Sequence, residues 1–227
     1  MARFDAVLFD AGGVLVLPDP TVLSPLLTTY GGTEGTAPHR RAHYAGMAHK
    51  SRQGSNERDW SSYNDAYVAS LGISDDTKHH AAEVLDHTRS AHLWRWPSPE
   101  TLAALASLDS SGVPMGVVSN ASGQIAEVLS RAGICQAGAG PGVAMRVVID
   151  SHVVGVAKPD PRIFDFALPF FAEFERDRIL YVGDSVTMDI ASARGAGLHP
   201  VLIDPYDDHP DADFERIRSV EEIVPWF

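Results

Sequence analysis

The chain of 227 residues has one cysteine, few basic side chains for its acidic ones, and no long apolar run. A lone Cys135 cannot form an internal disulfide, so a disulfide-stapled fold is excluded and a reducing, cytoplasmic setting is expected. The formal net charge of −12 disfavours nucleic acid and anionic membrane surfaces as partners. The apolar segments are short and interrupted by charge, so no membrane-spanning segment is expected.

What the sequence has instead is a series of short apolar runs of the kind that form buried parallel strands. The N-terminal run carries Asp5 and Asp10 and has no small-residue cleavage site, so we interpret it as a strand and not as a signal peptide. Helical patterns between the runs predict an α/β fold with a doubly wound parallel sheet. The predicted strands are Ala6–Phe9, Met115–Ser119, Ile179–Gly183, Pro200–Ile203 and, with a weaker pattern, Val147–Asp150.

Residues 18–97 break this alternation of strands and helices. They contain no convincing strand but several helical patterns, the first of which begins at Asp19-Pro20. We therefore expect an all-helical domain over residues 18–97, inserted into a core domain formed by residues 1–17 and 98–227.

Three of the predicted strands end in polar side chains: Asp10, Ser119-Asn120 and Asp184-Ser185. One such residue alone would be explained by a turn or a helix cap. Three at the edge of an open α/β sheet favour a ligand site, because ligands bind beyond the carboxyl ends of the strands. Converging carboxylates raise each other's pKa unless a cation lies between them, and oxygen ligands favour a hard ion such as Mg²⁺.

Two further features point to an anionic ligand. Gly12 and Gly13 follow Asp10 and allow backbone N–H groups to approach a phosphate closely. Lys158 lies between small residues and prolines in GVAKPDPRIF. It is either a solvated surface lysine or a phosphate-binding cation, and its rigid setting before a helix start favours the second interpretation.

The motifs FDAGGVL, VVSN, AKPDPRIF and VGDSVTMD, in this order, resemble the four signature motifs of the haloacid dehalogenase superfamily. Most members of that superfamily are Mg²⁺-dependent phosphatases, and a helical cap follows the first strand in many of them, as the insertion does here. The resemblance implies a Rossmann-like core with a helical cap. It also implies a phosphatase that acts on a small phosphorylated metabolite, a small anionic substrate.

The resemblance assigns roles to individual residues. Asp10 matches the nucleophile that takes the phosphoryl group, Ser119 the hydroxyl that binds a phosphate oxygen, and Lys158 the cation that orients the nucleophile. Gly13 and Asn120 fall within the same phosphate-binding set.

The metal ligands implied by the resemblance are Asp10, Asp184 and the backbone carbonyl of Gly12, with Asp189 behind them. The chain departs from the family at the same glycine. Most family phosphatases have an aspartate there, which protonates the leaving alcohol and then activates water. Because Gly12 can do neither, we expect slow turnover.

Three alternatives stay open. The first is a non-catalytic binding or regulatory protein that keeps the phosphate pocket. The second is a dehalogenase, a branch that uses no metal and usually has uncharged residues in the last motif, where this chain has two carboxylates. The third is a phosphonate-cleaving enzyme, for which Lys50 and Lys78 are candidates by residue type only.

The inserted segment carries a basic stretch between residues 36 and 52. At helical spacing it would form either a positive face that closes over an anionic substrate or a solvated face. His43 is the residue of this stripe that could replace the missing acid, while the aromatic stripe further on is interpreted as cap core. The stripe residues are Arg40, His43, Met47 and Lys50, and the aromatic ones are Trp60, Tyr63 and Tyr67.

Overall fold

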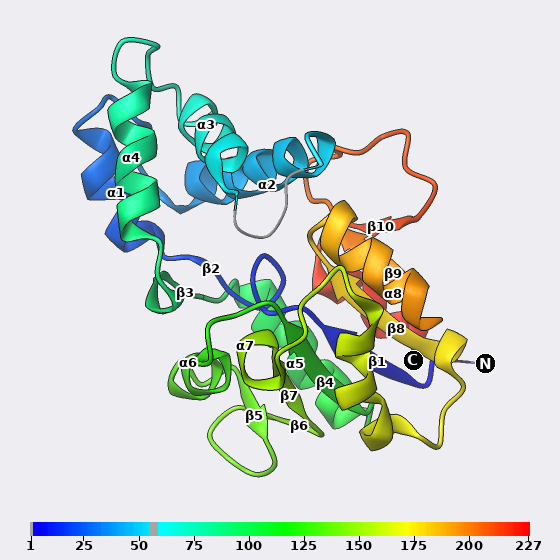
Figure 1. Cartoon of the computed structure of the whole chain (residues 1–227). Helices are drawn as coiled ribbons and strands as arrows, with labels where there is room; N and C mark the ends of the chain where they lie inside the picture. The colour runs from blue at the N-terminus through cyan, green and yellow to red at the C-terminus, as the bar shows by residue number, and fades with distance from the viewer. Residues whose placement is uncertain (1, 55–58) are drawn as a thin grey trace.

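A six-stranded parallel sheet lies at the centre of the computed structural model, which describes residues 2–54 and 59–227 (Figure 1). The strand order is β10-β9-β8-β1-β4-β7, so the chain winds outward from β1 in both directions, as the doubly wound prediction requires. The strands are β1 (Ala6–Phe9), β4 (Met115–Ser119), β7 (Val148–Asp150), β8 (Ile179–Gly183), β9 (His199–Ile203) and β10 (Glu215–Ile217).

All five strands predicted from apolar runs are present, with ends shifted by one residue in β7 and β9. The sixth, β10, has the sequence Glu-Arg-Ile and carries too little apolar character to be predicted. It forms because β9 offers a free edge, to which residues 215–217 pair in register, and Ile217 becomes buried.

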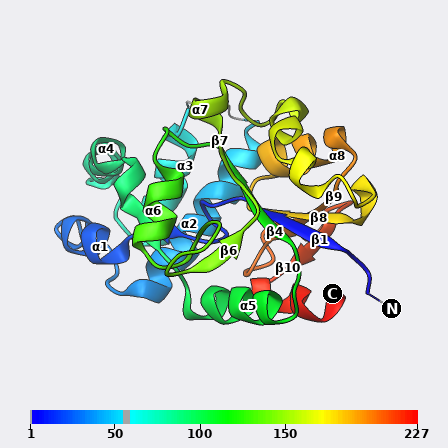
Figure 2. The same ribbon diagram turned by 90° about the horizontal axis from the view of Figure 1, so that it is seen from below.

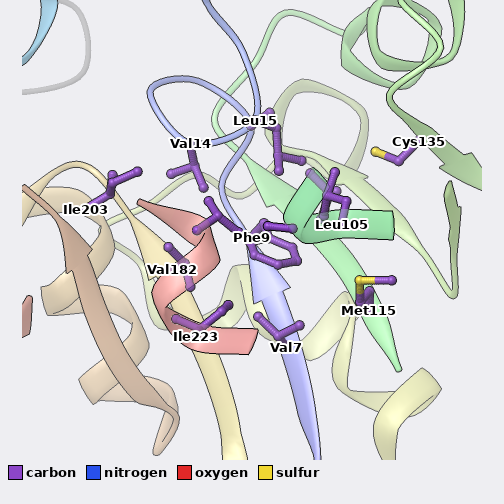
Figure 3. Close-up of a cluster of buried hydrophobic side chains, with 14 of the residues drawn as sticks. Val7, Phe9, Val14, Leu15, Leu105, Met115, Cys135, Val182, Ile203 and Ile223 are labelled. Atoms are coloured by element: carbon purple, nitrogen blue, oxygen red, sulfur yellow. The ribbon is translucent and has the colours of Figure 1, made fainter. Parts of the chain in front are cut away.

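The two faces of the sheet are covered by different segments, because successive side chains of a strand point to opposite faces. Val7 and Phe9 pack with Leu105 and Ile223 on one face (Figure 3). Ala6 and Leu8 lie on the other face, in a buried cluster that includes residues 193 and 196. The first face is covered by α5 (Pro99–Ser110) and η6 (Val220–Trp226), the second by η2 (Pro161–Phe166), η3 (Leu168–Phe171) and α8 (Ala191–Ala196). Figure 2 shows α5 and α8 on opposite sides of the sheet.

The helix predicted to begin at Asp160-Pro161 is the two short 3₁₀ segments η2 and η3. Pro169, in the first turn of η3, lacks the N–H that a continuous α-helix would need there. The other core elements are β5 (Cys135–Ala137), β6 (Val143–Met145), α6 (Ile125–Arg131), α7 (Ser151–Val154), η4 (Arg176–Arg178) and the π-helical turn η5 (Val186–Ile190).

The segment inserted after β1 is helical and has its own buried cluster, which includes Leu27, Tyr67 and Leu85. Its helices are α1 (Pro20–Thr28), α2 (Thr36–Arg52), α3 (Ser61–Ser70), α4 (Lys78–Thr88) and η1 (Ala91–Leu93). Among the described residues, no helix has both the length and the apolar character that a bilayer crossing requires.

A short antiparallel ribbon lies where the chain enters and leaves this helical segment. It consists of β2 (Leu17–Pro18) and β3 (Trp94–Trp96), which the sequence did not predict because each is shorter than a periodic pattern can reveal. The ribbon lies at residues 17–18 and 94–96, close to the predicted boundaries at 18 and 97, which themselves stay a prediction.

Candidate active site

Three carboxylates meet at the carboxyl end of the central strands. Asp10 follows β1 and Asp184 follows the neighbouring strand β8, so strand pairing brings the two together. Asp189, five residues further on in η5, joins them, and one oxygen of each carboxylate lies within 4.8 Å of the others. All three side chains are buried. The tertiary structure therefore assembles the acidic cluster that the strand-end pattern predicted.

Lys158 is buried inside this cluster and is not a surface lysine. Its Nζ lies 3.0 Å from Asp10 Oδ1 and 2.6 Å from Asp189 Oδ1, and it donates to the hydroxyl of Tyr181 at 2.9 Å. Burial by itself would lower the pKa of Lys158, but the two carboxylates outweigh it and raise that pKa. The lysine stays charged and points at the proposed nucleophile.

Asn120 holds the backbone of this lysine in place. Its side-chain carbonyl accepts from the Lys158 N–H at 2.8 Å, and its amide donates to the Lys158 carbonyl at 2.9 Å. Because Asn120 directly follows β4, this paired contact attaches the lysine loop to the end of the sheet. The contact positions Lys158, while the phosphate-binding role predicted for Asn120 stays a prediction.

Asp189 supports the cluster from behind. Its Oδ2 accepts from the backbone N–H groups of Asp184 and Ser185 at 3.1 and 2.9 Å. Its Oδ1 accepts from Lys158 and lies 3.0 Å from the hydroxyl of Tyr181. Tyr181 is a site residue that the sequence analysis missed. The signal was a tyrosine inside a buried strand, whose hydroxyl must find a polar partner.

The electrostatics of the cluster suit a divalent cation. Burial raises the pKa of Asp10 to about 7, and Asp189 and Asp184 add to this, while Lys158 and a hydrogen bond from Ser119 act in the opposite direction. One lysine does not neutralise three carboxylates. The donor set is oxygen only, which fits a hard ion such as Mg²⁺, with Asp10, Asp184 and the carbonyl of Gly12 as the residues that would hold it.

The two glycines after Asp10 are required for different reasons. Gly13 has φ +75°, and a Cβ there would lie 1.8 Å from Asp184 Oδ2, so any side chain would displace that carboxylate. Gly12 has no such strain, but a Cβ there would lie 3.2 Å from two ring atoms of Trp94. The indole of Trp94 thus lies next to the position at which the family's acid would begin.

His43 lies beside the cluster but does not line the cavity above it. It is fully buried, with Nε2 3.1 Å from Asp184 Oδ2 and Nδ1 3.0 Å from the hydroxyl of Tyr63. Burial lowers the pKa of His43 to about 3, so the ring is neutral near pH 7. The structure places this histidine against a carboxylate of the acidic cluster, whereas its predicted role as a substitute acid stays untested.

The family model described as haloacid dehalogenase-like hydrolase matches residues 4–197. The chain belongs to this family. Its relatives include the (S)-2-haloacid dehalogenase H-109 of Pseudomonas putida, 30% identical over 141 residues, which are 60% of this chain and 59% of the relative. They also include the glyceraldehyde 3-phosphate phosphatase of Methanopyrus kandleri, 28% identical over 171 residues and 70% of each chain. The chain thus matches less than two thirds of the dehalogenase.

Solved structures show the same fold. A phosphatase of this family from Thermococcus onnurineus has a TM-score of 0.58 at 21% identity, covering 97% of this chain and 96% of that one. A dehalogenase with an intermediate complex has a TM-score of 0.61 at 17% identity, covering 99% and 97%. The predicted family and the Rossmann-like core are confirmed. Because the relatives include phosphatases and dehalogenases, the comparisons leave the hydrolase's substrate open.

A cavity of about 370 Å³ opens above the acidic cluster of the hydrolase. Its floor includes Asp10, Ser119, Lys158 and Asp184, so the structure brings the predicted catalytic residues to one surface. Residues of the helical segment line the other side: Met47, Lys50, Trp60, Arg89 and Trp94. The volume suits a small ligand held between the core and the helical segment.

The predicted stripe of α2 is divided between two environments. Met47 and Lys50 line the cavity, while Arg40 lies 3.9 Å from Glu100 and His43 contacts Asp184. Of the two lysines considered for phosphonate cleavage, only Lys50 lines the cavity.

The other candidate lysine, Lys78, is half exposed and pairs with Asp75 at 2.8 Å. The aromatic stripe is divided as well: Tyr63 and Tyr67 are buried as predicted, whereas Trp60 lines the cavity. The sequence analysis also missed Arg89, because an arginine just after a helix has no distinguishing pattern.

Proposed function

We propose that this hydrolase is a Mg²⁺-dependent phosphatase of small phosphate monoesters, with Asp10 as the nucleophile. The observation that carries the proposal is the trio of buried carboxylates around a buried lysine. A metal-free dehalogenation has no use for Asp184 beside an attacking carboxylate, since it would oppose the approach of an anion. The phosphatase relative from Methanopyrus kandleri supports the same reaction class.

In the proposed reaction, a carboxylate oxygen of Asp10 attacks phosphorus, and the bond from phosphorus to the alcohol oxygen breaks. Lys158 neutralises part of the charge and keeps the attacking carboxylate ionised and oriented. The hydroxyl of Ser119, which hydrogen-bonds Asp10 in this structure, would donate to a phosphoryl oxygen. Mg²⁺, when bound, supplies the further positive charge that a dianionic phosphate needs near a carboxylate. Water then attacks the aspartyl-phosphate and restores Asp10.

The second step lacks its usual base. Position 12 has no side chain, and the ring of Trp94 lies next to it. A positioned acid or base contributes about 10²- to 10⁴-fold to the rate. Hydrolysis of the aspartyl-phosphate is therefore the slow step when the leaving group needs no proton.

p-Nitrophenyl phosphate tests this, because its leaving group departs without an acid. With Mg²⁺ we expect a burst of about one p-nitrophenol per chain, followed by slow steady turnover. Asp10 should carry phosphate in quenched samples analysed by mass spectrometry. Asp10→Asn should lose both the burst and the adduct, while Asp75→Asn, an exposed control, should keep them.

A dehalogenase is the second candidate, because the relative from Pseudomonas putida is 30% identical. Release of chloride from 2-chloropropanoate without added metal, with no p-nitrophenol from the phosphate ester, would establish it and overturn the phosphatase. Tight phosphate binding without either reaction would support the non-catalytic alternative.

A further inference from the structure

We propose that the cap side of the cavity holds a subsite for a second anionic group, built on Arg89 and Trp60. The inference rests on the proposed function and names its substrate class: a phosphate monoester whose alcohol part carries a carboxylate or a similar anion. The phosphoryl group would lie at Asp10 on the cavity floor, and the second anion would lie against Arg89.

Arg89 is held so that one of its nitrogens lacks an acceptor. Its Nη2 donates to Asn64 Oδ1 at 2.6 Å, and its guanidinium carbon lies 4.5 Å from the ring centre of Trp60. Nη1 is buried and has no hydrogen-bond partner among the described residues. A buried charged donor without an acceptor is costly. Because the Arg89 side chain lines the cavity, a small rotation of the guanidinium would let this nitrogen donate to a ligand's oxygen there.

The acidic neighbour of Arg89 does not satisfy that nitrogen. Asp86 lies 3.4 Å from Nη2, not Nη1, and its side chain is 68% exposed. Its attraction is therefore largely screened by solvent. Burial lowers the pKa of Arg89 without removing its charge, because a guanidinium keeps its proton throughout the range in which proteins are folded.

A second cation contacts the same indole. Lys50 Nζ lies 4.1 Å from the ring centre of Trp60 and donates to the carbonyl of Asp59 at 2.6 Å. Lys50, Arg89 and Trp60 all line the cavity. Two cationic side chains thus lie at the cap side of the cavity, and the carboxylates near them, Asp59 and Asp86, are exposed.

The charges at the two ends of the cavity explain why the second anion would bind at the cap. On the floor, three carboxylates and Lys158 sum to zero charge once a divalent ion is present, so no excess positive charge remains there for a second anion. At the cap end, Arg89 and Lys50 are cationic, and solvent screens the exposed carboxylates near them. A ligand with an anion at each end matches both charge patterns, while a neutral or cationic tail matches only the floor.

Three phosphonates that this site would bind without an ester bond to cleave test the inference by calorimetry in the presence of Mg²⁺. They are 3-phosphonopropanoate, propylphosphonate and 2-aminoethylphosphonate, which share the phosphonate and differ in the charge of the tail. We expect the carboxylate ligand to bind about 10- to 100-fold more tightly than the propyl ligand, the usual effect of one charged hydrogen bond. The ammonium ligand should bind more weakly than the propyl ligand.

Variants of this protein assign the preference to Arg89. Arg89→Gln should bring the affinities of the carboxylate and propyl ligands to within about threefold, and Arg89→Lys should keep part of the difference. Lys78→Gln, the loss of an exposed cap lysine outside the cavity, should leave the difference unchanged. Thermal unfolding of each variant shows whether it folds.

The outcomes separate this inference from the proposed function. Equal binding of all three phosphonates by the native protein would overturn the subsite and leave the phosphatase standing. A full preference in folded Arg89→Gln would also overturn it. If Arg89→Gln fails to fold, the phosphonate affinities of the native protein and of Arg89→Lys test the subsite instead. An unchanged preference for the carboxylate ligand in Arg89→Lys would count against the guanidinium as its binding group. No binding of any phosphonate, together with no p-nitrophenol release, would overturn the function and the subsite together.

Discussion

Gly12 and Trp94 share one small space in front of the nucleophile. A Cβ at position 12 would lie 3.2 Å from the Trp94 ring, closer than side chains normally pack. A carboxylate added there would have to move the indole, which also packs edge-on against His43 with ring centres 5.5 Å apart. A side chain at position 12 and the Trp94 ring therefore compete for the same space.

We predict that Gly12→Asp alone gives little gain in turnover, because Trp94 blocks the new side chain. Gly12→Asp combined with Trp94→Leu should speed hydrolysis of the aspartyl-phosphate by about tenfold or more, since the base regains its space. Steady-state release of p-nitrophenol after the burst measures this step.

Trp94→Leu alone is the control and should leave the slow step unchanged or slower. If Gly12→Asp alone reached a steady rate as high as that of the double variant, Trp94 would be shown not to obstruct position 12.

At the scale of elements, helix α2 fastens the helical segment to the core. The Tyr44 hydroxyl donates to the carbonyl of Gly13 at 2.7 Å, beside the acidic cluster. One turn earlier, Arg41 forms a two-bond ion pair with Asp208 at 2.7 and 2.8 Å, in the loop that follows β9 (Figure 1). The same helix carries Lys50, which lines the cavity. The position of α2 on the core therefore affects the distance between the two sides of the cavity.

Arg41→Gln should weaken the contact between α2 and the core. Because the ion pair is partly exposed, we expect substrate binding to lose at most about 1 kcal/mol of free energy, which would raise the Michaelis constant by up to about fivefold. The chemical step after binding should change little, because Arg41 does not line the cavity.

Arg162→Gln is a matched control, since Arg162 pairs with Asp160 in an exposed contact within the core. It should leave the Michaelis constant unchanged. An unchanged constant in Arg41→Gln as well would show that the ion pair does not hold the helix in its working position.

At the scale of the whole molecule, the acidic cluster links folding to pH and to metal. The pKa of Asp10 is raised to about 7, above the 3.8 of a solvated aspartate, so the metal-free folded state holds this proton more tightly than the unfolded chain does. Between about pH 4 and pH 7, the contribution of Asp10 to the stability of the metal-free protein should therefore fall as pH rises, whereas the contribution of His43, whose pKa is lowered to about 3, should rise and offset it.

Mg²⁺ should stabilise the protein most where Asp10 is ionised, because it binds the ionised carboxylate. We predict that Mg²⁺ raises the melting temperature more at pH 8 than at pH 6. At pH 6 most Asp10 side chains are protonated, so Mg²⁺ should bind about tenfold more weakly than at pH 8. Circular dichroism melts with Mg²⁺ and with a chelator measure the difference.

Asp184→Asn should lose most of the Mg²⁺ effect at both pH values. A rise of equal size at pH 6 and pH 8 in the native protein would show that Asp10 is not the group that the metal deprotonates.

The sequence by itself determined the core of the fold. Each central strand is a continuous apolar run, so β1, β4 and β8 could be predicted to the residue. Helix α5 between them also has a start signal, the Ser98 cap followed by Pro99. Lys158 and the strand-end carboxylates were also identifiable. The ribbon of β2 and β3 and the edge strand β10 could not be, because they are short and form only through their partners.

Only the tertiary structure brought particular strand-end aspartates together. Asp10, Asp150, Asp184 and Asp204 all lie at the ends of apolar strands, and the strand-end pattern does not rank them, although the motif resemblance singled out Asp10 and Asp184. Asp150 accepts from the N–H groups of residues 123 and 152, and Asp204 from those of residues 208 and 209, so both brace loops. Asp10 and Asp184 meet because β1 pairs with β8, whereas β9 lies one strand beyond β8 and β7 lies two strands beyond β1. Neighbouring positions in the sheet, which no local pattern encodes, therefore separate the clustered carboxylates from those that brace loops.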